Sequence, residues 1–359
     1  MEPIRAAIVG TGNIARSHVE SLRDLGDQVS VVAAVDTDDA RLAAFCDRYG
    51  IPARHRDLVT LLERDRPDLV HVCTPPGAHY ALALSCLQAG STVLVEKPPT
   101  LSLAELDNLI EAEQKYQASL ATVFQHRFGT GALRLRAMLD AGVLGRPLLA
   151  VCHTTWFRDQ AYFDVEWRGR WDTEGGGPTM GHGIHQMDLL CAVLGDWTEV
   201  RAVARQQARR TETEDLSMAH VSFANGAVAS VVNSLLSIRE ESYLRFDFER
   251  ATVELTHLYG YGDDDWRITP APKYTDEVLA AWRNGATGVR SHHRAQFAEV
   301  VRSLRAGTPP PVTSAESRRT LRLVAGIYAS AFTGRPVSPR DLTTDSPYYH
   351  RMAGDGPRW

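Results

Sequence analysis

The chain has 359 residues, of which 44% are hydrophobic and 23% are charged, and 39 basic against 44 acidic residues give a net charge of −5. This length suits two domains, and the mild acidity argues against partners such as nucleic acid or a membrane surface. Five scattered cysteines without a C-x-x-C pair, and an apolar strand almost at the N-terminus, lead us to expect a cytoplasmic protein with reduced thiols.

Apolar runs alternate with amphipathic segments over about the first 125 residues. The expected strands are continuous apolar runs, typical of parallel strands covered on both faces, at 4–9, 29–35, 69–73, 92–95 and 119–124. The expected helices lie between or after them, at 12–24, 38–48, 57–64, 77–89 and 102–117. The last helix opens with Ser102-x-x-Glu105, a capping box. This order predicts an α/β domain, residues 1–125, built on a doubly wound parallel sheet.

The pattern changes after residue 126. A helix is expected within 131–145 and a strand at 148–157, followed by two hairpins, one within 217–236 around Asn225-Gly226 and one within 243–256. Two further helices are expected at about 291–306 and 314–332. We therefore expect an α+β domain over residues 126–342, with a largely antiparallel open sheet, and a polar tail over residues 343–359.

A glycine-rich turn follows the first strand. "AAIVGTGNIA" contains Gly10-x-Gly12-x-x-Ala15, where glycines permit a tight turn and let the backbone approach a pyrophosphate at a helix N-terminus. Asp36 ends the second strand, where a carboxylate can bind a ribose 2′-hydroxyl. Because no arginine directly follows Asp36, the sequence favours NAD over NADP as the cofactor.

Lysine is scarce in this chain, since only Lys97, Lys115 and Lys273 occur among the 39 basic residues. Lys97 lies in "TVLVEKPPT", at the carboxyl end of an expected parallel strand, which is the edge where ligands bind to open α/β sheets. A lysine there can stabilise a developing alkoxide or share its proton, although it can also be a solvated strand-end residue. The proline after it could form a cis peptide bond.

The stretch "GGGPTMGHGIHQMDLL" places His182, His185 and Asp188 at three-residue intervals. This pattern could serve metal binding, proton transfer or ordinary packing. Over six residues an ideal helix turns the outer two side chains well apart, and the spacing is not H-E-x-x-H, so no metal site is expected. His292 and His293 begin a helix and are expected to be solvated.

Taken together, "GTGNIA", "VCTPPGAHY", "VEKPPTLS" and the glycine-rich run before His185 resemble the Gfo/Idh/MocA oxidoreductases over roughly residues 4 to 340. The resemblance implies a Rossmann domain and a second domain whose open sheet often forms a homodimer or homotetramer. It implies that Lys97 contacts the reacting hydroxyl and the nicotinamide ribose, and that "FQHRF" at 124–128 and "WRGRW" at 167–171 reach the site. The residues expected to bind the cofactor are Gly10, Gly12, Asn13, Ile14, Asp36, Thr74, Pro75, His79, Glu96, Lys97, Gln125, Trp167 and Arg168.

One departure from the family pattern concerns the proton-transfer group. His185 matches the family histidine and Asp188 its later aspartate, but Gly181 stands where the family commonly has an aspartate that orients or charge-balances this group. We expect Lys97 and His185 to be catalytic, with His185 as the general base. The residues expected to bind substrate are Lys97, Arg127, Trp156, His182 and His185.

Three functions remain open from the sequence. The first is an NAD-dependent dehydrogenase that oxidises a secondary hydroxyl of a sugar, sugar derivative or cyclitol, with Lys97 and His185 facing the same nicotinamide carbon. The second is a glycosidase or epimerase that oxidises its substrate transiently with tightly held NAD. The third, favoured by the absence of the aspartate at Gly181, is a dinucleotide-binding protein without catalysis.

Overall fold

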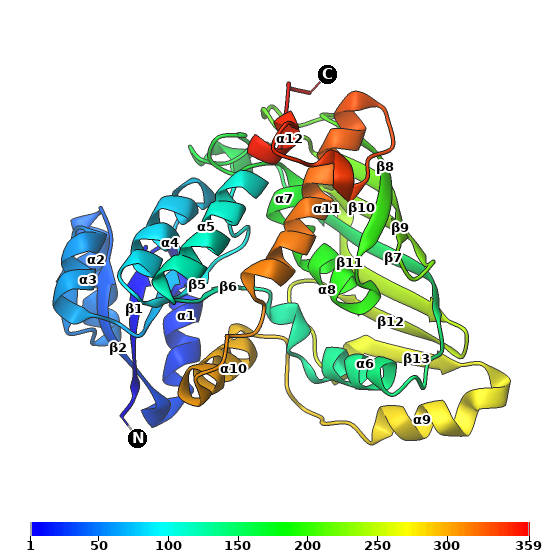
Figure 1. The fold of residues 1–359 in the computed structure, drawn as a ribbon, viewed down its shortest axis with the longest axis horizontal. Coiled ribbons are helices and arrows are strands. Elements are labelled where there is room, and N and C mark those ends of the chain that lie inside the picture. Colours follow the sequence, from blue (N-terminus) through cyan, green and yellow to red (C-terminus); the bar gives the residue numbers. More distant parts are fainter. Residues whose placement is uncertain (1, 358) are drawn as a thin grey trace. The chain divides into compact units, whose positions relative to one another are not determined.

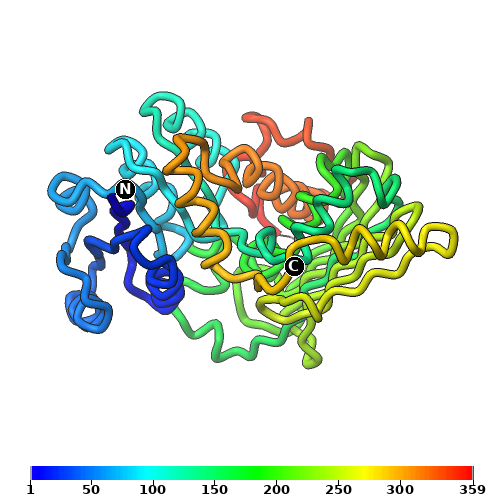
Figure 2. Tube along the Cα trace, turned by 90° about the horizontal axis from the view of Figure 1, so that it is seen from below, coloured from blue at the N-terminus to red at the C-terminus, as the bar shows by residue number. Residues whose placement is uncertain are grey.

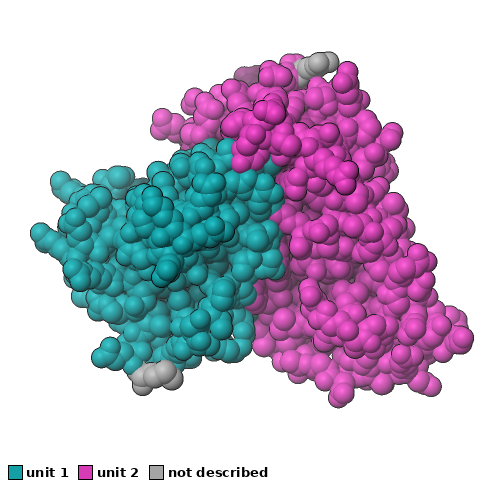
Figure 3. Space-filling model, viewed as in Figure 1, with its two compact units in different colours: residues 1–123, 293–318 teal, residues 124–292, 319–359 magenta. Residues whose placement is uncertain are grey.

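The chain forms two compact units in the computed structural model, which describes residues 2–357 and 359 (Figure 3). Unit 1 comprises the chain up to Val123 together with His293–Arg318, and unit 2 comprises Phe124–His292 and the chain from Arg319 onward. The first boundary lies close to the expected one at residue 125. However, 293–318 belongs to unit 1, although the sequence placed it in the domain 126–342.

Unit 1 is built on a six-stranded parallel sheet with the strand order β3-β2-β1-β4-β5-β6, so the predicted doubly wound sheet is confirmed (Figure 1). Its strands are β1 (Ile4–Val9), β2 (Val29–Val35), β3 (Ala53–His55), β4 (Leu69–Val72), β5 (Thr92–Val95) and β6 (Leu120–Thr122). The sequence did not predict β3, a three-residue edge strand. The central strands β4 and β5 are buried along their whole length, which explains their continuous apolar sequence.

The helices of unit 1 are α1 (Asn13–Arg23), α2 (Asp39–Tyr49), α3 (Leu58–Asp65), α4 (His79–Gln88), α5 (Leu103–Tyr116) and α10 (His293–Ala306). The capping interaction predicted for α5 is present, since Ser102 Oγ accepts from the Glu105 N–H at 3.1 Å. In Figure 2, α10, in orange, lies beside the blue and cyan part of the chain. Its Phe297, Val300 and Val301 are fully buried in the same core as Val19 and Leu22 of α1, which is why α10 belongs to this unit.

Unit 2 contains a seven-stranded sheet with the order β13-β12-β11-β7-β10-β9-β8, in which all neighbours are antiparallel except β7 and β10. The predicted largely antiparallel sheet is therefore confirmed, with one parallel pair. The strands are β7 (Pro147–Phe157), β8 (Trp197–Arg205), β9 (Leu216–Phe223), β10 (Val228–Ser234), β11 (Leu236–Phe248), β12 (Ala251–His257) and β13 (Trp266–Pro270). Both expected hairpins are present, β9–β10 and β11–β12, and Gly226 has φ +87° in the first turn.

The helices of unit 2 pack mainly against this sheet or at its end (Figure 1). They are α6 (Thr130–Asp140), α7 (Pro178–Gly181), α8 (Ile184–Leu194), α9 (Thr275–Arg283) and α12 (Pro347–His350), while α11 (Ser314–Thr333) begins in unit 1 and continues into unit 2. The C-terminal segment from Thr343 packs on its own unit, because Tyr348 is buried and the Trp359 ring lies 5.4 Å from that of Phe332. In the described part of the chain, no helix combines the length and apolarity needed to cross a membrane.

Candidate active site

The turn after β1 has the features of an anion site. Gly10 has φ +84°, and a Cβ there would lie 2.8 Å from Thr74 Cγ2, so both conformation and space require glycine. At Gly12 a Cβ would meet nothing within 4 Å. α1 begins at Asn13 with no side-chain cap and no acidic residue in its first turn. Its first backbone N–H groups and the open space at Gly12 therefore suit a pyrophosphate.

Asp36 is held at the end of β2 by several donors. Its Oδ2 accepts from the Thr11 N–H at 2.7 Å and the Thr11 hydroxyl at 2.8 Å, while Arg41 donates to both carboxylate oxygens, at 3.1 and 2.7 Å. Although burial raises the pKa of Asp36, the hydrogen bonds from Arg41, Asp38 and Thr11 lower it well below its usual range. The carboxylate is therefore ionised. The Arg41 side chain is 49% exposed, so a ribose hydroxyl could displace it at modest cost.

The loop after β4 combines an accessible part with a rigid anchor. The Thr74 hydroxyl oxygen is buried without a hydrogen-bond partner among the described residues, which leaves it available to a ligand, and Pro75 is exposed. His79, predicted to bind the cofactor, is instead fully buried. Its Nδ1 lies 2.7 Å from the Pro98 carbonyl oxygen and its Nε2 lies 2.9 Å from that of Thr74. His79 therefore ties the loop after β4 to the loop after β5.

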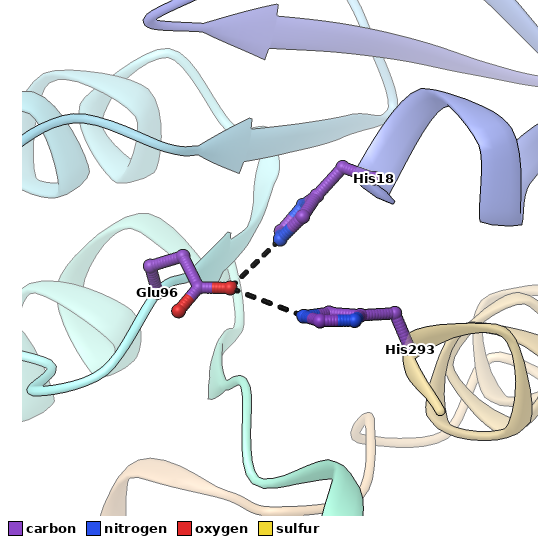
Figure 4. A group of neighbouring side chains, drawn as sticks. All are labelled: His18, Glu96 and His293. Carbon is purple, nitrogen blue, oxygen red and sulfur yellow. Dashed lines mark hydrogen bonds and ion pairs between the residues drawn. The ribbon is translucent and has the colours of Figure 1, made fainter. Parts of the chain in front are cut away.

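Glu96 and Lys97 follow β5, and the Lys97–Pro98 peptide bond is cis, the isomer that the sequence left open. The Lys97 side chain is partly buried, whereas Glu96 is buried between His18 of α1 and His293 of α10 (Figure 4). Burial raises the pKa of Glu96, but hydrogen bonds from His18 and His293 outweigh it and hold that pKa well below its usual value. The expectation that His293 is solvated is wrong, since its side chain is only 16% exposed.

The glycine-rich run 175–177 allows the chain to pack tightly before the two histidines. A Cβ at Gly177 would lie 1.8 Å from the Glu214 carbonyl oxygen, and one at Gly183 would lie 1.8 Å from Asn233 Oδ1. The buried Glu214 carboxylate also accepts from the N–H groups of Gly177 and Thr179. α7 then ends at Gly181 and α8 begins at Ile184, so the segment is two short helices rather than one.

His182 and His185 have different surroundings. The His182 ring contacts Trp156 edge-on at 5.3 Å between centroids, and its Nε2 lies 3.2 Å from the Tyr162 hydroxyl. His185, in the first turn of α8, lies 5.0 Å from the ring of His126. His182 lies between α7 and α8 whereas His185 lies within α8, so the two histidines do not share one helical face.

Asp188 and Arg127 form a buried ion pair. Arg127 donates from Nε and Nη2 to the two oxygens of Asp188, both at 2.7 Å, and the Thr320 hydroxyl donates to Asp188 at 3.0 Å. Asp188 is fully buried and the Arg127 side chain is 13% exposed. Arg127 was predicted to bind substrate, but the structure engages its guanidinium with Asp188, so it anchors α8 to the segment that follows Phe124.

Aromatic and arginine side chains gather beside His182. The guanidinium of Arg158 lies over the Trp156 ring at 5.2 Å, and that of Arg168 lies over Tyr162 at 4.0 Å and over Trp167 at 4.3 Å. Trp156 also donates from its ring nitrogen to Ser242 Oγ at 3.0 Å. In the neighbouring η3 (Gln125–Arg127), Gln125 Oε1 is buried and has no partner among the residues described. Aromatic rings flanked by hydrogen-bonding side chains are a combination that suits a polyhydroxylated ring.

Glu174 lies beside Gly181, a placement that the sequence did not reveal. A Cβ at Gly181 would lie 3.5 Å from Glu174 Oε1. The Glu174 side chain is 6% exposed, its Oε2 accepts from the Gly169 N–H at 2.6 Å, and Arg168 lies 3.4 Å from Oε1. A carboxylate therefore occupies the side of residue 181 toward which an aspartate there would project.

Several known proteins are similar to this chain over nearly its whole length. D-glucoside 3-dehydrogenase of Escherichia coli K12 is 28% identical, with 93% of this chain and 97% of that protein covered. D-apiose dehydrogenase of Paraburkholderia graminis is 25% identical, covering 96% and 92%. Among solved structures, the WlbA dehydrogenase of Chromobacterium violaceum, in complex with NADH and UDP-GlcNAcA, has a TM-score of 0.82 at 27% identity and covers 94% and 96%.

Family models match the two parts of the chain separately. Residues 4–124 match the oxidoreductase family with an NAD-binding Rossmann fold, and residues 132–257 match the C-terminal domain of the same family. The parallel sheet with its glycine turn and the largely antiparallel second sheet agree with both matches. The chain therefore belongs to the Gfo/Idh/MocA family of NAD-binding oxidoreductases.

Proposed function

We propose that the protein is an NAD-dependent dehydrogenase that oxidises a secondary hydroxyl of a sugar, a sugar derivative or a cyclitol. Membership of the family and relatives named as sugar dehydrogenases support this reaction class. The observation that carries the proposal is the Glu174 carboxylate beside Gly181. It supplies a negative charge close to the position where the family aspartate is missing, which removes the strongest argument for a protein without catalysis.

In this proposal the cofactor is held mainly by the turn Gly10–Ala15, Asp36 and Thr74. The N–H groups at the start of α1 bind the pyrophosphate, and the ionised Asp36 accepts from the adenine-side ribose. The same carboxylate repels a 2′-phosphate, so NAD is favoured over NADP. When bound, NAD supplies the acceptor for the hydride that leaves the substrate carbon.

Two side chains handle the proton of the reacting hydroxyl. Lys97 donates a hydrogen bond to the hydroxyl oxygen and stabilises the negative charge that develops as the proton leaves. His185 accepts that proton as the general base. Glu174 is a positioning residue: its negative charge near the 181–185 segment stabilises the positive charge that the imidazole acquires.

The substrate ring is proposed to lie against Trp156 and His182, with Tyr162 and Arg168 supplying hydrogen-bond partners from the same cluster. Trp167, stacked with Arg168, remains a proposed cofactor contact, as do Asn13, Ile14, Pro75 and Gln125. The Glu96 carboxylate, which was also expected to bind the cofactor, is enclosed by His18 and His293. Arg127 positions α8 through Asp188 in this scheme and does not itself contact the substrate.

The proposal is tested by a screen of glycosides, polyols and cyclitols with NAD, in which the absorbance of NADH is followed. A dehydrogenase accumulates NADH with at least one compound. A product formed without net NADH would instead indicate a glycosidase or epimerase that oxidises transiently, and NAD binding without turnover would support the non-catalytic alternative. Lys97→Ala is expected to abolish turnover while NAD still binds, measured by calorimetry.

The role of Glu174 has its own test. Because hydrogen bonds and ion pairs to a charged group contribute about 1.5–3 kcal/mol, Glu174→Gln is expected to lower kcat/KM by roughly 10- to 100-fold. Glu166→Gln, an exposed position in the same segment, is the matched control and should match the wild type. Adding Gly181→Asp to Glu174→Gln should restore part of the activity, because it returns a carboxylate to the same space. An unchanged kcat/KM in Glu174→Gln would refute this role.

We further propose a homodimer or homotetramer assembled through the sheet of unit 2, in the cytoplasm. Leu149, Val203, Met218 and Val228 are each 42 to 49% exposed, and the strand registers pair Leu149 with Val228 and Val203 with Met218. An open sheet face with exposed apolar side chains supports association with a second copy. Light scattering on the wild type and on Met218→Glu tests it, since the charged variant should dissociate.

All five cysteines are buried as free thiols, which fits a reducing compartment.

A further inference from the structure

Unit 1 buries a cluster of imidazoles around one carboxylate. His18 comes from α1, Glu96 follows β5 and His293 begins α10, and in Figure 4 all three side chains point toward one another. Nε2 of His18 lies 2.9 Å from Glu96 Oε1, and Nε2 of His293 lies 3.4 Å from the same oxygen. The three side chains are 0%, 8% and 16% exposed, so the cluster is almost closed to solvent.

The donor set is one that transition metals prefer. Two imidazole nitrogens and a carboxylate oxygen offer ligand atoms that all lie within 4.8 Å of one another. Zinc binds such ligands at about 2.0–2.2 Å in a tetrahedron, which places neighbouring ligand atoms about 3.3–3.5 Å apart. The His293–Glu96 separation already has this value. The His18–Glu96 separation would need to widen by about half an ångström.

A fourth side chain, His71, can hold the second ring nitrogen of His18, as groups beside metal-ligating histidines commonly do. His71 of β4 is fully buried, and its Nδ1 lies 2.9 Å from Nδ1 of His18. One of these two nitrogens donates and the other accepts. Without metal, His18 donates from Nε2 to Glu96, so its Nδ1 accepts from His71. With metal bound, His18 would donate from Nδ1 to His71 and offer the lone pair of Nε2 to the ion. A ligating histidine normally has its other ring nitrogen held in this way. Nε2 of His71 has no hydrogen-bond partner within the described chain.

We propose that His18, Glu96 and His293 bind one divalent transition-metal ion, zinc by preference, with water as the fourth ligand on the side of His293. The ion has a structural function and takes no part in hydride or proton transfer. It joins α1, the loop that carries Lys97, and α10. It thereby fixes the helix that follows the glycine turn against the strand end beside it.

The experiment measures metal content and coordination in the full-length protein. After chelator treatment and gel filtration, the wild type is titrated with Zn²⁺ and, separately, with Co²⁺. We expect one equivalent of zinc per chain by elemental analysis, with Kd at or below the micromolar range, and visible Co²⁺ absorption bands of tetrahedral intensity. At a hundredfold excess over Kd, zinc should raise the Tm of the 359-residue chain by about 3–4 °C.

Two variants separate a metal site from nonspecific binding. His293→Gln removes one ligand at the partly exposed edge of the cluster and should lose both the stoichiometric zinc and the Co²⁺ bands. His292→Gln changes the exposed neighbouring histidine and should retain them. The proposal is overturned if the wild type holds less than about a tenth of an equivalent, or if His293→Gln binds zinc and cobalt as the wild type does. NAD binding and turnover are not readouts here, so the result is independent of the proposed function.

Discussion

Glu214 makes the stability of unit 2 depend on pH. Its carboxyl group is 1% exposed and accepts hydrogen bonds from the Gly177 and Thr179 N–H groups and, at 2.9 Å, from the Tyr328 hydroxyl. Burial raises its pKa from 4.5 to about 7, and these hydrogen bonds offset the effect only in part. The folded protein therefore holds a proton on Glu214 at pH values where the unfolded chain has lost it.

The sign follows from this difference. The stabilising contribution of protonated Glu214 is fully present below pH 4.5 and is lost as the pH rises through about 7. A difference of about 2.5 pKa units corresponds to about 3 kcal/mol in the free energy of unfolding. Glu214→Gln keeps the shape and a carbonyl acceptor but never ionises. Relative to the wild type, the variant should therefore gain about 3 kcal/mol between pH 4.5 and pH 8.5.

The assay is urea unfolding of both proteins at half-unit pH intervals over this range. Only the difference between the two curves is interpreted, because all other titrating groups are shared. Glu212→Gln, an exposed glutamate two residues away, is the control and should give a constant difference. Parallel curves for the wild type and Glu214→Gln across the whole range would refute the assignment of a raised pKa to Glu214.

The remaining predictions concern the cofactor turn and the ion pair that anchors α8. Gly12→Ala should weaken NAD binding, measured by calorimetry, with little change in Tm. Gly10→Ala should lower Tm in a thermal melt, because the new Cβ would lie 2.8 Å from Thr74. Asp36→Ala should lower kcat/KM for NAD about 10- to 100-fold. The ratio of NADP to NAD activity should rise, because Arg41 loses its ion pair with Asp36. Steady-state kinetics with both cofactors measures both effects. Asp188→Ala removes the buried ion pair with Arg127 and should cost about 3–5 kcal/mol in urea unfolding.

The fold was largely predictable because the buried strands carry a strong signal. β1, β2, β4 and β5 are continuous apolar runs, and the Asn225-Gly226 turn specifies its hairpin. β8 was missed because Glu199 and Arg201 interrupt its apolar residues on the exposed side. The place of α10 in unit 1 could not be predicted from position along the chain. It depends on Phe297, Val300 and Val301 fitting the core around α1, which only the folded structure reveals.

The site residues divide in the same way. Gly10, Asp36 and Lys97 lie at strand ends, where the parallel sheet fixes their place, so sequence position alone identifies them as candidates. The partners of Arg127 and His79 could not be predicted, because residue spacing does not show which distant groups a side chain will contact. Each is engaged by groups far along the chain, Asp188 for Arg127 and the Pro98 carbonyl for His79.

Glu174 illustrates why a missing residue in a motif is weak grounds for a missing function. When the sequence is compared with the family pattern position by position, Gly181 counts as the loss of a carboxylate. The spacing along the sequence does not link Glu174 to that position. Gly176 packs too closely against Tyr328, and Gly177 against Glu214, for any side chain, and the bend through these glycines returns the chain so that Glu174 Oε1 lies beside residue 181. A Cβ at residue 181 would be in ordinary contact with this carboxylate, 3.5 Å from Oε1. Proton transfer requires a negative charge at a given point in space, and that charge can come from any segment that the fold brings there.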